Sequence, residues 1–116
     1  MSTRIGVTAE KVAADWLEAK GYKVVARNWR SRTAEIDIIA SLGGELVFIE
    51  SKYRFDTRHG TGLDYLTQQK LRQMLRAAEE YMINNPSDSP YKIAAIALGG
   101  KPPSVEEFVE SIDFDG

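Results

Sequence analysis

Apolar residues recur at helical spacing near the start of the chain. They stand at i, i+3, i+4, i+7 and i+8, the pattern of an amphipathic helix with one buried stripe. Gly21 is a natural C-terminal stop, so we expect this helix to end near Lys20. The residues of the stripe are Ala9, Val12, Ala13, Trp16 and Leu17.

Three strand-like segments follow. Residues 22–28 alternate loosely between polar and apolar side chains and contain valine and tyrosine, which favour strands. The stretch AEIDIIASLGGELVFIESK, residues 34–52, consists of two apolar runs around a Gly-Gly pair, which is typical of a hairpin with a two-residue turn. The pattern therefore predicts a single strand followed by a hairpin.

The second half of the chain contains a loop, a long helix and a buried strand. Residues 54–62 mix charges with two glycines and indicate a loop. Residues 91–100 form a mostly apolar run of strand length, which fits a buried central strand, whereas residues 105–112 fit either a helical turn or an edge strand. Between them, helical spacing from position 71 predicts a helix that ends before the NNPSDSP segment, with a face comprising Leu71, Met74, Leu75, Ala78, Tyr81 and Met82.

The predicted order is α, β, β, β, α, β, which describes an α/β fold with a mixed sheet flanked by helices. A chain of 116 residues has the size of one domain, so we expect residues 1–116 to share one core. The sequence contains no cysteine, which excludes disulfides and thiolate metal sites, and no apolar run long enough to span a membrane. We expect a soluble, cytoplasmic protein without a membrane partner.

Charge is unevenly distributed along the chain. The net charge is −2, with a pI near 5.4, which argues mildly against a dedicated nucleic-acid binder. However, the segment from Lys20 to Arg76 contains eleven basic and six acidic residues, whereas the segment from Ser104 to Gly116 contains five acidic residues and no basic one. This asymmetry fits either a polyanion-binding face or a solvated mixture of charges.

The hairpin turn determines which charged side chains face one another. A two-residue Gly-Gly turn places Asp37 opposite Glu50 and Glu35 opposite Lys52, all on one side of the hairpin. Two like charges at cross-strand distance are destabilising, and a divalent cation such as Mg²⁺, which prefers oxygen ligands, offsets their repulsion. Lys52 then points at the same space, and we expect Glu35, which faces Lys52, to orient it. The opposite, core-facing side comprises Ile36, Ile38, Ala40, Val47 and Ile49.

Two interpretations of these charges remain open at this point. The first is an ordinary solvated sheet face on which Glu35 and Lys52 form a cross-strand ion pair. The second is a cation site built from Asp37 and Glu50, with Lys52 as a cationic donor for a phosphate or a metal-activated water.

The same residues carry a resemblance to known proteins. Asp37 followed by Glu50-Ser51-Lys52 resembles the D…(D/E)-x-K signature of the restriction-endonuclease-like superfamily, known as PD-(D/E)xK nucleases. More closely, residues 4–40 together with the segment LVFIESKYR resemble the YraN-type family of small bacterial proteins. The resemblance implies a restriction-endonuclease-like αβββαβ core and Mg²⁺- or Mn²⁺-dependent phosphodiester cleavage. It also implies that Glu10, on the first helix, is a third metal ligand beside Asp37 and Glu50.

Basic residues near these segments are candidate contacts to nucleic acid. Basic side chains around Trp29 suit phosphate contact with stacking, but they also fit a surface strand end with one packed tryptophan. Lys70 begins the basic side of the long helix, which in related nucleases borders the cleft; a solvated helix face is the alternative. The candidate nucleic-acid-binding residues are Arg27, Arg30, Arg54 and Lys70.

The sequence therefore predicts a metal-dependent endonuclease acting on DNA, branched or junction DNA included. Asp37, Glu50 and Glu10 are the expected metal ligands, and Lys52 and Glu35 the expected catalytic residues. The alternative is a non-catalytic nucleic-acid-binding or scaffolding module that keeps the nuclease fold. Archaeal Holliday-junction resolvases resemble a related branch, and this resemblance also implies a homodimer.

Overall fold

The chain folds into a five-stranded mixed sheet with one helix on each side. The structure is a computed structural model that describes residues 2–55 and 63–113. Its elements are α1 (Ser2–Ala19), β1 (Lys23–Arg30), β2 (Glu35–Leu42), β3 (Glu45–Arg54), α2 (Gln68–Asn84), β4 (Tyr91–Gly99) and β5 (Ser104–Val109). The predicted αβββαβ order is confirmed, and the undecided C-terminal segment is a strand. Residues 56–62 of the predicted loop lie outside the described residues.

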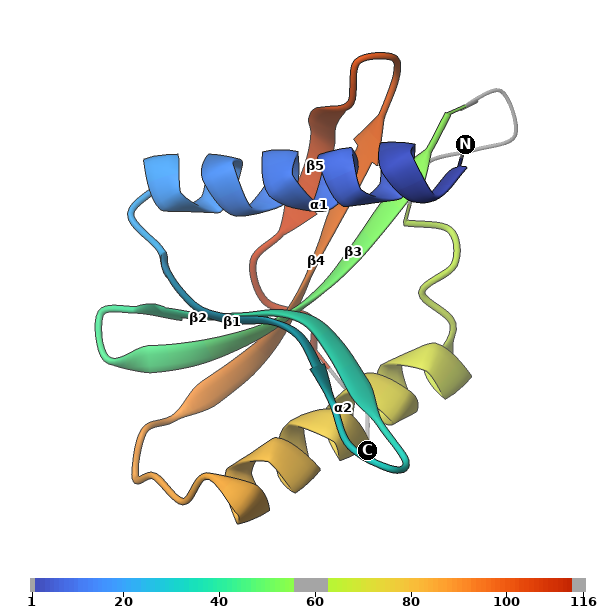
Figure 1. Cartoon of the computed structure of the whole chain (residues 1–116). Coiled ribbons are helices and arrows are strands. Elements are labelled where there is room, and N and C mark those ends of the chain that lie inside the picture. Colours follow the sequence, from blue (N-terminus) through green and yellow to red (C-terminus); the bar gives the residue numbers. More distant parts are fainter. Residues whose placement is uncertain (1, 56–62, 114–116) are drawn as a thin grey trace.

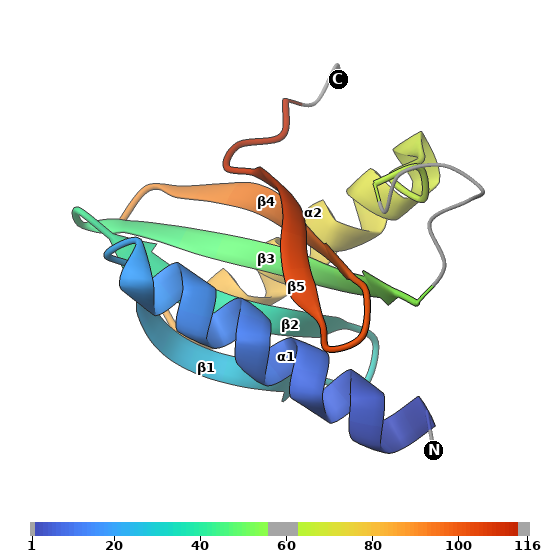
Figure 2. The same ribbon diagram turned by 90° about the horizontal axis from the view of Figure 1, so that it is seen from above.

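The strands follow their order in the chain, β1-β2-β3-β4-β5. Every neighbouring pair is antiparallel except β3 and β4, which are parallel and are connected through α2. A parallel pair needs such a crossover, because the chain must return to the starting end of the sheet. Figure 1 shows α1 and α2 on opposite sides of the sheet, and Figure 2 shows α1 lying across the strands.

Each helix seals one face of the sheet with a separate core. Leu17 and Ala13 of α1 pack with Ile38, Val47 and Ile49, together with the inward-facing residues of β4. On the other face, buried residues of α2 pack against strands β2, β3 and β4 in a cluster comprising Ile36, Ile39, Phe48, Leu71, Met74, Ala77, Ala78 and Ile93. Because both faces are covered, the central strands are apolar on both sides, which explains the nearly continuous apolar runs in the sequence.

Local signals set the ends of both helices. Tyr22 donates its backbone N–H to the carbonyl of Leu17 at 3.0 Å, and Gly21 has a φ of +99°, as in a Schellman-type end of α1. Thr67 caps the start of α2, since its hydroxyl accepts the backbone N–H of Lys70 at 3.1 Å. This cap fixes the start of α2 three residues before Lys70.

The predicted hairpin register is confirmed up to its fifth pair. Leu42 faces Glu45 across Gly43 and Gly44, which have φ values of +59° and +84°, and the pairing continues to Ile38 and Ile49. The ladder ends there, one pair before Asp37 and Glu50.

The expected alternation of side chains along β2 is wrong at its start. Ile36 packs on the α2 face, whereas Ile38 packs on the α1 face, so the alternation breaks at Asp37. Asn28 of β1 lies at the same level, between the pairs Arg27–Ile38 and Trp29–Ile36, and has a left-handed φ of +54°. The regular strand geometry is therefore interrupted at the level of Asp37, where the predicted site begins.

No helix within the described part of the chain has the length and apolar character needed to cross a membrane.

Candidate functional site

The site is built where β2 and β3 stop pairing. Past this point the N–H of Ser51 donates to Oδ2 of Asp37 at 2.8 Å, so a carboxylate takes the position of a backbone acceptor. Glu50, the residue before Ser51, has a side chain that is only 18% exposed. Asp37 and Glu50, here called the acid pair, thus both lie half-buried at the opened end of the hairpin.

The two carboxylates of the acid pair affect each other's ionisation. Burial raises the pKa of Asp37, and the charges of Glu10 and Glu35 raise it further, against the opposing effects of the Ser51 N–H and Lys70. Burial, followed by the charge of Asp37, raises the pKa of Glu50 to about 7, although Lys70 opposes that rise. The position therefore disfavours the ionised form of both carboxylates, mainly because of burial.

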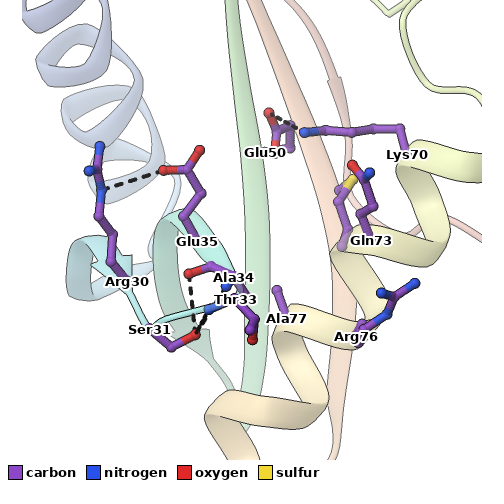
Figure 3. A pocket seen from close by; sticks show the side chains of 11 residues that line it. Arg30, Ser31, Thr33, Ala34, Glu35, Glu50, Lys70, Gln73, Arg76 and Ala77 are labelled. Atoms are coloured by element: carbon purple, nitrogen blue, oxygen red, sulfur yellow. Dashed lines mark hydrogen bonds and ion pairs between the residues drawn. The ribbon is translucent and has the colours of Figure 1, made fainter.

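Lys70 is the cation that contacts the acid pair. Its Nζ lies 3.5 Å from Oε2 of Glu50, and the two side chains point toward each other from α2 and β3 (Figure 3). Lys70 was predicted as a nucleic-acid contact on the rim of a cleft; the structure places it against a carboxylate of the candidate metal site. Because its side chain is still 34% exposed, it also remains accessible to a ligand.

Lys52 and Glu35 do not form the expected cross-strand contact. Nζ of Lys52 lies 5.7 Å from the ring centroid of Tyr65, a cation–π distance. Glu35 instead pairs with its neighbour on β1, since its Oε2 lies 3.4 Å from Nε of Arg30 and both side chains are largely exposed. Lys52 stays on β3 two residues from Glu50, but Glu35 does not orient it.

Glu10 reaches the site from α1. Its Oε1 accepts a long hydrogen bond, 3.4 Å, from the side-chain amide of Asn28, and its charge contributes to the raised pKa of Asp37. Within the described residues, however, no group of three or more His, Cys, Asp or Glu side chains is arranged to hold a metal ion. Glu10 is thus near the acid pair, while the three carboxylates do not form one coordination cluster.

A groove of about 390 Å³ runs from Glu50 between α2 and the β1–β2 connection; we call it the α2 groove (Figure 3). The connection is fixed to α2 because the hydroxyl of Thr33 donates to Glu80 at 2.9 Å. A second hollow of about 670 Å³ shares Arg30 with the groove and extends it past Trp29 and Arg32. The polar residues of the α2 groove are Arg30, Ser31, Thr33, Glu35, Glu50, Lys70, Gln73 and Arg76.

The other candidate nucleic-acid contacts are dispersed. Arg30 lines the α2 groove, whereas Arg27 is exposed on β1 and is not among the groove's lining residues. Arg54 ends β3 and is near enough to Tyr65 for its charge to affect that phenol. Only Arg30 and Lys70 of the four predicted basic contacts therefore share one groove.

Sequence reasoning missed two residues of the site, Asn28 and Tyr65. Asn28 sits in the left-handed region, which asparagine tolerates better than most residues, and an asparagine within a strand pattern is the one signal that marked it. Tyr65 lies in the segment before the cap of α2, where nothing in the spacing connected it to the acid pair.

The fold and the site together define a mixed α/β protein with two half-buried carboxylates, a lysine in contact with one of them and an adjoining groove. Sequence comparison supplies the family: the model described as "Uncharacterised protein family UPF0102" matches residues 9–98, and the chain belongs to this family. The YraN-type resemblance is thereby confirmed at the level of the family.

Several relatives match over most of their length. The UPF0102 protein STH1475 of Symbiobacterium thermophilum is 44% identical over 90 residues, which cover 78% of this chain and 76% of the relative. A UPF0102 protein of Chromohalobacter salexigens is 36% identical over 111 residues, covering 95% and 90% of the two chains. One from Roseiflexus castenholzii is 32% identical over 114 residues, covering 97% and 92%. These names assign no reaction.

Proposed function

We propose that this chain is a metal-dependent nuclease that hydrolyses phosphodiester bonds in DNA. The observation that carries the proposal is the acid pair: Asp37 and Glu50, from adjacent strands, are half-buried, the backbone N–H of Ser51 holds Asp37, and burial raises the pKa of both carboxylates. Ionising two carboxylates in a partly buried position costs stability, and a bound cation would offset that cost. In this proposal the αβββαβ portion of the fold is a restriction-endonuclease-like core.

The donor set of the acid pair fits a hard divalent cation. Asp37 and Glu50 offer only oxygen, and Mg²⁺ is commonly held by one or two carboxylates, with waters and phosphate oxygens as its other ligands. A third protein carboxylate is therefore not needed, although Glu10 is near enough for its charge to act on Asp37. When bound, Mg²⁺ or Mn²⁺ supplies Lewis-acid activation of a water and of a phosphate oxygen.

Other residues of the chain would bind the phosphates of the substrate and hold Asp37 in position. Lys70 contacts Glu50 from α2, and Lys52 lies on β3 two residues beyond Glu50, beside the ring of Tyr65. In the proposal each offers an ammonium group that suits a phosphate oxygen. Arg30 and Arg76 line the α2 groove beyond them and bind the neighbouring phosphates of the strand. The Ser51 N–H holds Asp37 in place through its 2.8 Å hydrogen bond, which limits rotation of that carboxylate.

A second candidate function is a nucleic-acid-binding module without catalysis. The specific observation in its favour is the absence, among residues 8–55 and 63–113, of a group of three or more potential metal ligands. Lys70 bound to Glu50 then serves as a permanent counter-charge, and the α2 groove alone accounts for binding. This alternative predicts nucleic-acid binding that does not depend on divalent metal.

The deciding experiment combines metal titration with cleavage of linear, flapped and branched DNA. The wild type is expected to cut at least one of these substrates in Mg²⁺ or Mn²⁺, and Lys52→Ala is expected to reduce the rate by about 100-fold or more, because it removes charge stabilisation at the phosphate. Lys92→Ala, at the start of β4 and paired with Glu45, removes the same charge away from the site and serves as the control. The enzyme proposal fails if no substrate is cut in either metal, or if Lys52→Ala cuts as fast as the control.

A further inference from the structure

Trp29 lines the second hollow beside the α2 groove and has no role in the proposed catalysis; we call this hollow of about 670 Å³ the Trp29 hollow. The indole is half-buried, and it meets the ring of Tyr81 edge to face, with centroids 5.4 Å apart and planes at 79°. In either orientation of such a contact, Tyr81 leaves at least one face of the indole uncovered. The fold therefore fixes this ring while part of it borders an accessible space.

The Trp29 hollow continues the α2 groove. Arg30, Ser31 and Thr33 of the β1–β2 connection line both, and Figure 3 shows these three residues along the groove that begins at Glu50. Together the two spaces follow α2 from Lys70 to its last residue, Asn84. Since a helix rises by about 1.5 Å per residue, this path is roughly 21 Å long, which accommodates several nucleotides of one strand.

Two arginines lie beside the indole in the Trp29 hollow. Arg30 and Arg32 are both exposed. The ion pair of Arg30 with Glu35 is largely exposed, so a phosphate can replace that carboxylate at little cost. Glu80, the acidic residue of the lining, already accepts the hydroxyl of Thr33 at 2.9 Å. An aromatic ring with guanidinium groups beside it suits a nucleic-acid strand, which offers a base to the ring and phosphates to the cations.

The indole is reachable by an unpaired base but not by a base within a duplex. Bases of a duplex are stacked on their neighbours, so a base must leave that stack before it can lie on a protein ring. A duplex could still place its phosphates on the exposed arginines, and Trp29 would then contribute nothing. Asn84, at the same hollow, offers an amide donor and acceptor for the edge of an unpaired base.

We propose that the Trp29 hollow binds an unpaired strand of the DNA substrate, with one base stacked on the indole and phosphates on Arg30 and Arg32. The inference rests on the proposed function, because it takes as its ligand the strand that continues from the acid pair through the α2 groove. It narrows the substrate class to DNA with a single-stranded segment, such as a flap.

The second tryptophan of the chain provides a matched control. The sequence contains two tryptophans. Trp16, on α1, is half-buried in the core on the opposite face of the sheet, where it meets Phe108 edge to face at 5.3 Å. Trp16→Phe leaves Trp29 as the only tryptophan, and Trp29→Phe leaves Trp16. The intrinsic fluorescence of each variant therefore reports one ring, and both variants keep an aromatic side chain at the changed position.

The experiment titrates these variants in Ca²⁺ with a single-stranded oligothymidylate, a duplex of equal length and an abasic oligonucleotide that has the same phosphates without bases. The oligothymidylate is expected to quench the fluorescence of Trp16→Phe, and the duplex and the abasic strand are expected to leave it unchanged. The fluorescence of Trp29→Phe is expected to stay constant with all three. In addition, Trp29→Leu is expected to bind the oligothymidylate about tenfold more weakly than Trp16→Leu, because it loses one base-stacking contact.

The inference is overturned if the oligothymidylate leaves the fluorescence of Trp16→Phe unchanged, if the duplex or the abasic strand quenches it equally, or if folded Trp29→Leu and Trp16→Leu bind with equal affinity. Circular dichroism checks the fold of both leucine variants. If Trp29→Leu does not fold, the fluorescence of Trp16→Phe decides alone, since that variant retains Trp29.

Cleavage assays separate this inference from the nuclease proposal. A protein that stacks the oligothymidylate on Trp29 but cuts no DNA retains the inference and loses the nuclease proposal. A protein that cuts DNA while the fluorescence of Trp29 stays constant retains the nuclease proposal and loses the inference.

Discussion

Each end of the β2–β3 hairpin has a glutamate–lysine ion pair, but the surroundings of the two pairs differ. At the turn, Glu45 of β3 lies 3.6 Å from Lys92 of β4. At the open end, Glu50 of the same strand lies 3.5 Å from Lys70 of α2. Glu45 is 36% exposed and forms a one-to-one pair, whereas Glu50 is 18% exposed and interacts with Asp37 as well. The two ion pairs therefore have similar lengths, but only Glu50 has a second carboxylate beside it.

This difference indicates which charged cluster is a site. An exposed one-to-one ion pair contributes little and requires no ligand. At the open end one lysine faces two carboxylates, and burial, followed by the charge of Asp37, raises the pKa of Glu50 to about 7. The burial of a second carboxylate beside Glu50, rather than the salt bridge, distinguishes the open end. Each prediction below changes one end and uses the other, or a matched neighbour, as its control.

The largest expected effect is on metal binding. Glu50→Gln replaces one carboxylate of the acid pair by a neutral amide. We expect the affinity of this variant for Mn²⁺ to be roughly 100-fold lower than that of the wild type, about 2.8 kcal/mol. Glu45→Gln is expected to bind Mn²⁺ as the wild type does, because that carboxylate has its own lysine. Isothermal titration calorimetry measures both affinities, and equal affinities in the two variants would contradict a metal site at the open end.

The next effect is on how stability depends on pH in metal-free protein. Glu50 has its pKa raised from 4.5 to about 7, so between these values the unfolded chain ionises while the folded protein stays protonated. Stability therefore falls as pH rises through this window and stays low above it, by an amount on the order of 1 to 3 kcal/mol. Urea unfolding in EDTA at pH 5 and pH 8 measures the change.

Two variants test the origin of this pH dependence. Glu50→Gln is expected to lose most of the decrease and to be more stable than the wild type at pH 8. Glu45→Gln is expected to retain the wild-type decrease. If Glu50→Gln keeps the full decrease, the raised pKa does not belong to this carboxylate.

Much of the fold could be predicted from sequence because its signals are local. The helical stripe from Ala9 to Leu17, the Gly43-Gly44 turn and the apolar run of β4 each require only neighbouring residues to interpret. The turn also set the hairpin register, and with it the approach of Asp37 to Glu50. The prediction of regular pairing to the end of the hairpin was wrong. The pair Ile38–Ile49 is the last one, and beyond it the Ser51 N–H donates to the Asp37 side chain.

The site was predictable only in part, because its other members come from distant segments. The side chain of Lys70 reaches Glu50 only because α2 packs across the sheet, and nothing within α2 encodes that distance. Tyr65 depends in the same way on the path of the chain into α2. The sequence alone could predict that α2 has a basic side, but tertiary packing determines which residue each basic side chain contacts.

A smaller effect is expected from removing the lysine at each end. Lys70→Ala leaves the acid pair with no direct cation, so we expect metal-free stability at pH 8 to fall by about 1 to 2 kcal/mol. Lys92→Ala breaks a one-to-one pair whose carboxylate is more exposed than Glu50, 36% against 18%, and we expect a change within about 0.5 kcal/mol. Urea unfolding in EDTA compares them, and losses of equal size would show that the two ends are electrostatically alike.

The smallest expected effect concerns the α2 groove, which adjoins only the open end. Arg76 lines this groove and Arg72, one turn earlier on α2, does not, although both are exposed. Arg76→Ala is expected to weaken binding of single-stranded DNA about three- to fivefold and to reduce the slope of log K against log salt by about 0.7, as for one phosphate contact. Arg72→Ala removes the same charge and is expected to leave the slope unchanged. Fluorescence anisotropy in Ca²⁺ at several salt concentrations measures both, and equal slopes for the two variants would mean that the helix attracts DNA through its overall charge, with no strand held in the groove.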